Sequence, residues 1–247
     1  SELASSGLPS KEELAILEPL RKDLPEEVFS KKFRPPLTDG SGNIRSQRRI
    51  ASKLLKEAGW TIKNGKRVNS AGEILKFEIL LISPAFERIV LPFKKNLERM
   101  GIEASVRVVD TSQYVNRIRS FDFDIITDQF RMSYEPGSGL KQYFGSETAK
   151  ESLFNSMGIS SPAIDYLIEV ISNVDNKLDL KNSVRALDRV LRAERFWIPQ
   201  WYKNVHTVSY FDMFEHPKPL PPYSLGYLDF WWVNPEKAAK LTEEGAL

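Results

Sequence analysis

Cysteine is absent from this chain of 247 residues, and histidine occurs only twice, as His206 and His216. Without thiols the chain has no disulfide, no thiolate metal ligand and no cysteine nucleophile. Neither histidine lies at metal-ligand spacing from another histidine or a paired carboxylate, which argues against a zinc site. A cysteine-free composition also fits an oxidising compartment, where stray thiols are a hazard.

An excess of charge of either sign is also missing. The chain has 35 lysine and arginine residues against 33 aspartate and glutamate residues, whereas a dedicated nucleic-acid binder normally shows a clear basic excess. We therefore predict no nucleic-acid partner. The densest basic row is Arg45, Arg48, Arg49, Lys53 and Lys56 on one predicted helix. We interpret this row as a solvated helix face, with phosphate binding as the alternative.

Recognisable catalytic motifs are absent too. The sequence contains no G-x-S-x-G elbow, no Walker A loop and no G-x-G-x-x-G after a strand. Asp122 and Asp124 flank Phe123 at strand spacing, which could place two carboxylates on one face. A strand entrance with one solvated and one capping aspartate is the interpretation that we favour. The sequence thus predicts no enzyme, no catalytic residue and no cofactor.

The periodicity in the first half of the chain predicts an α/β fold. Residues 75–82 form an apolar strand, residues 84–100 an amphipathic helix, and residues 102–109 an alternating strand. The short joints imply a right-handed crossover and a parallel strand pair. A helix over 111–120 and a short strand over 124–127 follow.

Capping and turn residues predict the remaining elements. Ser10 caps a helix over 10–18, and Ser161 caps a later helix with Pro162 at its first position. Asn64-Gly65 is a strong hairpin signal. Two more helices are expected, one from near residue 43 to Gly59 and one over 179–194.

Aromatic side chains are concentrated near the end of the chain. Residues 196–232 hold 12 of the 27 aromatic residues, including four of the five tryptophans, together with five prolines. Stiff rings give a large contact area at little cost in rotamer entropy, so this stretch predicts a recognition surface. Packing between two bodies of the protein is an equal alternative.

Several stretches, taken in order, resemble the solute-binding proteins of family 5, which deliver peptides to ABC importers. Each is weak alone, and together they extend from Ala51 to Leu167. The matching stretches are Ala51–Leu55 with Ala58-Gly59-Trp60, the helix 84–100 with Gly101-Ile102, Tyr114, Arg117, Phe123-Asp124, and Asn155, Gly158, Pro162, Asp165 and Leu167.

Within this family the chain is most similar to the YejA-type branch. The similarity rests on Glu2–Pro9, Ala186–Leu191, Ile198–Tyr202 and Trp231-Trp232. It implies the second lobe of a periplasmic binding protein of type II, with a mixed sheet flanked by helices, over residues 1–209. Residues 210–247 would return to a first lobe that this chain lacks, and Phe230, Trp231 and Trp232 would pack against that lobe.

The resemblance also implies a function. It predicts a non-catalytic periplasmic receptor that encloses a peptide or peptide-like ligand between two lobes and delivers it to an inner-membrane ABC permease. Its partners would be this ligand, the permease and the missing N-terminal lobe, with no metal. Two alternatives stay open. One is a hydrolase or transferase domain whose catalytic residues lie in a missing N-terminal half, and the other is an adhesion or chaperone-like module.

The ligand residues follow from a family motif in which an aspartate before a tyrosine pairs with the ligand's amino terminus. Here the stretch is Phe130-Arg131-Met132-Ser133-Tyr134, so Ser133 replaces the aspartate. Arg131 could bind a ligand carboxylate in a bidentate fashion, or form a salt bridge to Asp128 or Glu135. Phe130 and Tyr134 would line the cleft or fill the core, and Trp201 and Tyr202 would stack on the ligand.

Overall fold

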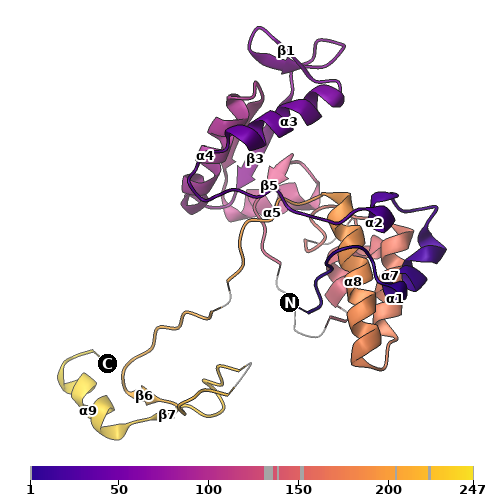
Figure 1. Ribbon diagram of the computed structural model, residues 1–247. Coiled ribbons are helices and arrows are strands. Elements are labelled where there is room, and N and C mark those ends of the chain that lie inside the picture. The colour runs from indigo at the N-terminus through magenta and orange to yellow at the C-terminus, as the bar shows by residue number, and fades with distance from the viewer. Residues whose placement is uncertain are drawn as a thin grey trace. The chain divides into compact units, whose positions relative to one another are not determined.

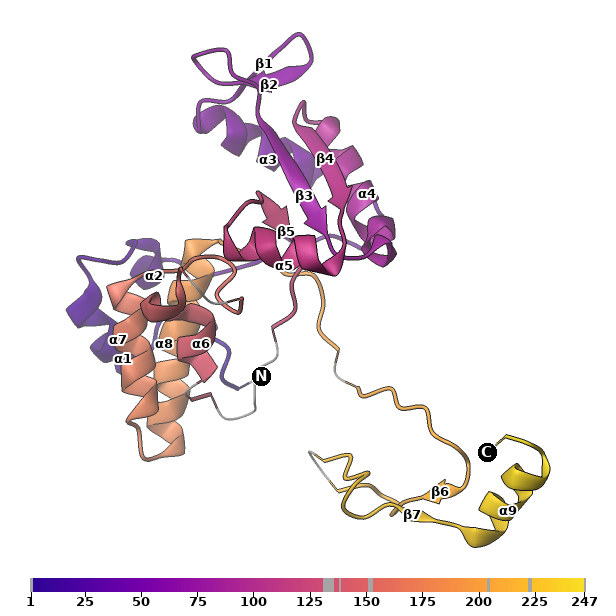
Figure 2. The same ribbon diagram turned by 180° about the vertical axis from the view of Figure 1, so that it is seen from behind.

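The computed structural model describes residues 2–130, 136–137, 139–150, 153–203, 205–221 and 224–246. The chain forms two compact units, Ser1–Trp197 and Ile198–Leu247, whose secondary structure can be followed from two sides in Figure 1 and Figure 2. The division between lobes at residues 209 and 210 stays a prediction.

A three-stranded sheet is the centre of the first half of unit 1. Its strands are β3 (Lys76–Leu81), β4 (Glu103–Val108) and β5 (Ile125–Ile126), in the order β4-β3-β5. β3 pairs in parallel with both neighbours, with Leu81 opposite Val108 and Leu80 opposite Ile126. The predicted strands and their parallel crossover are therefore confirmed.

Helices cover opposite faces of this sheet because neighbouring residues of β3 point to opposite sides. Ile79 and Leu81 pack with Val90 of α4 (Glu87–Glu98), which the turn η2 (Pro84–Phe86) precedes. Leu80 packs with two side chains of α5 (Thr111–Arg119), Tyr114 and Ile118. Figure 2 shows both helices beside the strands. The predicted α/β class with flanking helices is confirmed.

The three-stranded sheet is entirely parallel. The antiparallel pairs in the described residues form separate two-stranded sheets, so the predicted mixed sheet is not a single sheet here. β1 (Thr61–Lys63) and β2 (Lys66–Val68) form the predicted hairpin after α3 (Arg45–Glu57). Asn64 and Gly65 have φ angles of 49° and 77°, which a type I′ turn requires and which these two residue types tolerate.

A bundle of helices forms the rest of unit 1. Its largest apolar cluster includes Leu17, Ile164, Leu167, Ile168, Leu187 and Val190, none more than 2% exposed. The helices that supply it or adjoin it are α1 (Lys11–Leu17), η1 (Glu18–Leu20), α2 (Glu27–Ser30), α6 (Gly139–Phe144), η3 (Ser146–Thr148), α7 (Pro162–Ser172) and α8 (Lys177–Glu194).

The caps of these helices agree with the sequence in part. The Ser10 side chain accepts a hydrogen bond from the Glu13 backbone N–H, as predicted. Ser161 stands at the start of α7, but its side chain accepts no bond from the helix. α8 begins two residues before the predicted position because the Asn176 side chain accepts bonds from the next free N–H groups and fixes the first turn there.

The N-terminal segment is fixed to α8 by a buried ion pair. Arg189 Nε lies 2.6 Å from Glu13 Oε2, and both side chains are 3% exposed. The same guanidinium donates to the backbone carbonyls of Ser6, Gly7 and Leu8. The buried guanidinium is therefore hydrogen-bonded to one carboxylate and three carbonyl groups, which offsets the cost of burying its charge.

The described residues of unit 2 form a short antiparallel pair and one helix. β6 (Phe214–Glu215) pairs with β7 (Trp232–Val233), and α9 (Pro235–Glu243) follows. The Trp231 ring lies against Tyr210 and His216, with centroid distances of 4.7 and 4.6 Å, and its indole donates to the Leu225 carbonyl. Packing of Phe230, Trp231 and Trp232 against another lobe stays a prediction.

No helix in the described part of the chain is both long and apolar enough to span a bilayer.

Replacing Glu13 by alanine will leave the Arg189 guanidinium buried without its counter-charge. We expect the free energy of unfolding to fall by about 3–5 kcal/mol, measured by urea denaturation. Glu12→Ala, on the exposed side of the same turn, is the matched control and should change stability little. Equal effects of the two substitutions would contradict the role given to the ion pair.

Candidate functional site

The carboxyl ends of the three parallel strands define where a ligand would bind, because open α/β sheets hold ligands at that edge. Ser83 follows β3 and accepts a hydrogen bond from Ala85 N–H, and Asp110 follows β4 and accepts one from Gln113 N–H. Both side chains therefore cap the helices that come next. Asp128, two residues after β5, caps no helix and is exposed to solvent.

Asp128 is held in place by hydroxyl and amide donors. Its carboxylate accepts hydrogen bonds from the Ser156 hydroxyl at 2.8 Å and from the Gln129 backbone N–H at 2.7 Å. Beside it, the Tyr114 hydroxyl donates to the Thr127 carbonyl at 3.0 Å. This fixed carboxylate at the sheet edge can attract a cationic or hydrogen-bond-donating group.

Burial of Tyr114, assisted by the negative charge of Asp128, raises the pKa of its hydroxyl to about 12. Its phenol is therefore a neutral donor throughout the physiological range. The residue joins the sheet edge to the apolar cluster under α5, where its ring lies with Leu80 and Ile118.

Phe130 lies in an aromatic cluster. Its ring contacts Trp197 edge-on at a centroid distance of 4.8 Å, stacks with Phe144 at 6.1 Å and tilts against Tyr143 at 5.6 Å. It is half-buried against the core of the helical bundle. These contacts fix the ring where the segment leaves the sheet, and its role as a cleft wall stays a prediction.

Two of the other predicted ligand residues, Trp201 and Tyr202, lie among the described residues. Arg131, Ser133 and Tyr134 lie outside the described residues. Trp201 and Tyr202 belong to unit 2, where their side chains are 63% and 84% exposed. Their exposure leaves both rings free to meet another surface, and their role at a ligand stays a prediction.

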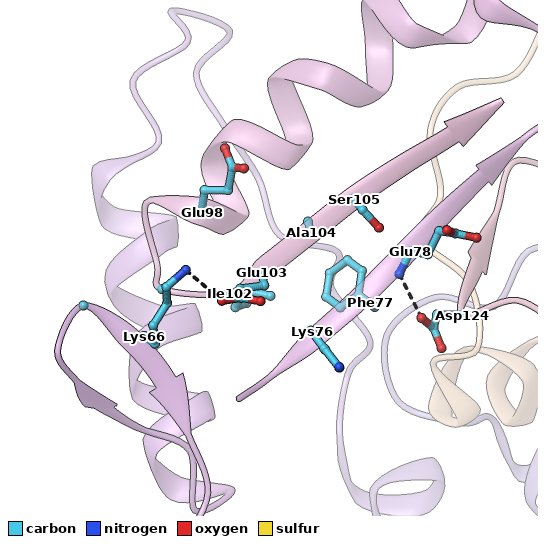
Figure 3. A pocket seen from close by; sticks show the side chains of 12 residues that line it. Lys66, Lys76, Phe77, Glu78, Glu98, Ile102, Glu103, Ala104, Ser105 and Asp124 are labelled. Atoms are coloured by element: carbon cyan, nitrogen blue, oxygen red, sulfur yellow. Dashed lines mark hydrogen bonds and ion pairs between the residues drawn. The ribbon is translucent and has the colours of Figure 1, made fainter. Parts of the chain in front are cut away.

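A hollow of about 740 Å³ lies at the opposite, amino-terminal end of the strands. Figure 3 shows its lining, in which Lys66 pairs with Glu103 at 2.8 Å and the Asp124 carboxylate accepts a hydrogen bond from Glu78 N–H at 2.8 Å. The carboxylate of Glu78 pairs with two arginines. These polar groups are already engaged in holding the strands and the hairpin.

Asp122 and Asp124 do not form an acid–base pair. Arg117 lies 3.0 Å from the Asp122 carboxylate, whereas Asp124 binds the backbone of β3. The favoured interpretation holds for Asp122, which is largely solvated, whereas Asp124 accepts its hydrogen bond within the sheet and caps no helix among the described residues. Among the residues that the structure describes, no three His, Cys, Asp or Glu side chains converge as a metal site.

The fold and the sequence together define the class of protein. The pattern of bacterial extracellular solute-binding proteins, family 5 (middle part), matches residues 27–152. This chain belongs to that family.

Two relatives make the similarity specific. The chain is 41% identical over 234 residues to the "Probable peptide-binding protein YejA" of Agrobacterium fabrum, covering 94% of this chain and 38% of that protein. It is 42% identical over 243 residues to the "Uncharacterized protein YejA" of Escherichia coli, covering 98% and 40%. The predicted similarity to YejA-type proteins is confirmed, and the chain spans about two fifths of the length of these relatives.

The oligopeptide-binding protein AppA of Bacillus subtilis, solved with a nonapeptide, shares the fold. Its TM-score is 0.59 at 16% identity, over 90% of this chain and 45% of that one. At this identity the likeness supports the architecture alone.

The sequence did not predict a place at the sheet edge for three residues. They are Tyr114, as a buried donor, Asp128 and Ser156. Asp128 had a usable signal, since a carboxylate just after a strand of a parallel sheet lies at the ligand edge. Ser156 had none, because it reaches Asp128 across 28 positions of chain.

The raised pKa of Tyr114 predicts how stability depends on pH. Because the folded pKa, about 12, exceeds the unfolded value of about 10, the stabilisation is complete below about pH 10 and is lost as the pH rises toward about 12. In Tyr114→Phe this decline should be smaller than in the parent chain. Urea denaturation across that pH window measures both curves, and parallel curves would contradict the assignment.

Proposed function

We propose that this chain is one lobe of a periplasmic receptor that binds a peptide or peptide-like ligand for an ABC importer. Two observations support the proposal. The chain belongs to the family of solute-binding proteins, and Asp128 and Phe130 follow the carboxyl ends of its parallel strands, where Asp128 is exposed. Enclosure between this lobe and a second one would exclude water and let fixed polar groups orient the ligand.

The chemistry of the described residues suits binding rather than catalysis. The candidate carboxylate pair at residues 122 and 124 is engaged in structural contacts, and the relatives that the chain matches are solute-binding proteins. The alternative of a hydrolase or transferase domain has no specific observation in its favour among the described residues.

Peptide-like ligands fit the residues predicted for the site. Arg131 would bind the ligand's carboxylate through two parallel N–H donors, in place of the ammonium capture that an aspartate at position 133 would give. Phe130, Ser133 and Tyr134 would form the wall around it, and Trp201 and Tyr202 would stack on its side chains. The printed name of the Agrobacterium relative, a probable peptide-binding protein, agrees with this ligand class.

Two partners complete the proposal. The relatives are about two and a half times as long as this chain, which leaves room for a first lobe opposite the sheet edge. An inner-membrane ABC permease would then receive the ligand from the closed receptor. Both partnerships rest on the family.

Calorimetry of the two-lobed receptor with short peptides and cell-wall peptides tests the ligand class, and binding of one set is expected. Arg131→Ala should weaken binding of peptides with a free carboxyl terminus by about tenfold to a hundredfold. Carboxyl-amidated peptides should be affected little, because they offer no carboxylate to bind.

Arg119→Ala, which removes an exposed arginine of α5, is the control and should leave both affinities unchanged. Equal losses for free and amidated peptides would remove the role given to Arg131. Silence with both peptide sets would contradict the proposed ligand class.

A further inference from the structure

The positive charge of this chain is gathered in one stretch. From Lys31 to Lys56 there are eight lysine and arginine residues and a single carboxylate, Asp39, so the stretch carries a net charge of +7. Since the whole chain carries +2, the other residues carry −5. Such a separation of charge is typical of a surface that meets an anionic partner.

Helix α3 within this stretch has an apolar face that nothing in the described residues covers. Ile50 and Leu54, one turn apart, are 60% and 59% exposed, and Leu37 in the preceding segment is 76% exposed. The helix is attached through its other side, where Leu55 packs against the cluster of Leu97, Ile102 and Ala104. Figure 1 and Figure 2 show α3 beside the hairpin of β1 and β2.

A hollow of about 820 Å³ lies beside this apolar face and is lined by both apolar and cationic side chains. It is lined by Leu37, Ile50, Arg45 and Arg49, among others, and the Gln47 side chain donates to the Leu37 carbonyl at 2.6 Å. The helix and the segment before it are therefore joined into one surface that carries apolar and cationic groups together.

Asp39 is the one carboxylate in the lining of this hollow. Its oxygen accepts hydrogen bonds from the Ser41 hydroxyl and backbone N–H, which hold the pKa of this carboxyl below its usual value. The carboxylate therefore stays ionised, and within the described residues it forms no ion pair with Arg45 or Arg49, so a single negative charge lies beside the two cations of this hollow.

The cations of α3 are largely free. Within the described part of the chain, Arg45, Arg49 and Lys56 form no ion pair, and Lys53 pairs only with Glu57, at 3.7 Å and with both side chains exposed. Exposed pairs of this kind contribute little. The exposed face of α3 therefore carries a net positive charge next to Ile50 and Leu54.

We propose that α3 and the segment from Leu37 dock on the surface of an anionic phospholipid bilayer. Arg45, Arg49 and Lys53 would bind lipid phosphates, and the apolar side chains, Leu37, Ile50 and Leu54, would enter the boundary between headgroups and acyl chains. An amphipathic helix with a cationic face next to exposed aliphatic side chains has the chemistry that such surfaces bind. A nucleic acid would use the cations but leave the aliphatic side chains in water.

This docking would hold the chain at a membrane face without a spanning helix. It goes beyond the proposed ligand binding and does not depend on it, because none of its residues belongs to the predicted ligand site. A failure of either proposal can therefore be told from a failure of the other.

Co-sedimentation of the 247-residue chain with phosphatidylcholine vesicles, with and without phosphatidylglycerol, tests the proposal. We expect binding only to the vesicles that contain phosphatidylglycerol, weakening as salt is added. The variant Arg45→Gln/Arg49→Gln/Lys53→Gln should lose about tenfold or more of this affinity. Ile50→Ser/Leu54→Ser should also weaken it, by about tenfold.

The matched control Lys95→Gln/Arg119→Gln/Lys177→Gln removes three exposed cations elsewhere and should bind like the parent chain. Circular dichroism and thermal melting confirm that each variant is folded. Equal loss in the control, retention of binding in the α3 variants, or absence of binding to the anionic vesicles would each overturn the proposal. Binding of α3 to an acidic protein instead of the vesicles would overturn it as well.

Discussion

The contact between Arg189 and Glu13 ties the two ends of unit 1 together. A guanidinium and a carboxylate that are almost fully buried, 176 positions apart in the chain, are 2.6 Å from each other. Leu17, four residues after Glu13, is completely buried in the core of the helical bundle beside Leu187 and Val190 of α8. The polar contact therefore fixes the register in which α1 packs on α8, and the aliphatic cluster supplies most of the favourable free energy.

A second set of ion pairs organises the sheet. Glu78, on β3, lies 2.7 Å from Arg107 of β4 and 2.9 Å from Arg117 of α5, while its backbone N–H binds Asp124 at the start of β5. These charged side chains are thus used to hold β3 to its neighbours. At the carboxyl edge Asp128 stays exposed, and this is the end of the sheet where we propose that a ligand binds.

Much of the fold, but less of the site, is predictable from the sequence. Hydrophobic periodicity predicted β3, α4 and β4 because burial imposes it directly on neighbouring residues. The start of α8 was placed too late, since capping by Asn176 decides it. The contacts of Asp128 with Ser156 and of Arg189 with Glu13 link positions far apart in the chain, and no local pattern reports them. For α3 the cations were visible in the sequence, but the exposure of Ile50 and Leu54 was not.

The central claim is that a ligand meets the carboxyl edge of the sheet. The most direct test is a nuclear magnetic resonance titration, in which a peptide that the receptor binds is added stepwise and the chemical shifts of the backbone amides are measured. We expect the largest shifts at residues 83, 110 and 127–134. Shifts confined to the amino-terminal hollow, around Lys66, Lys76 and Glu103, would contradict it.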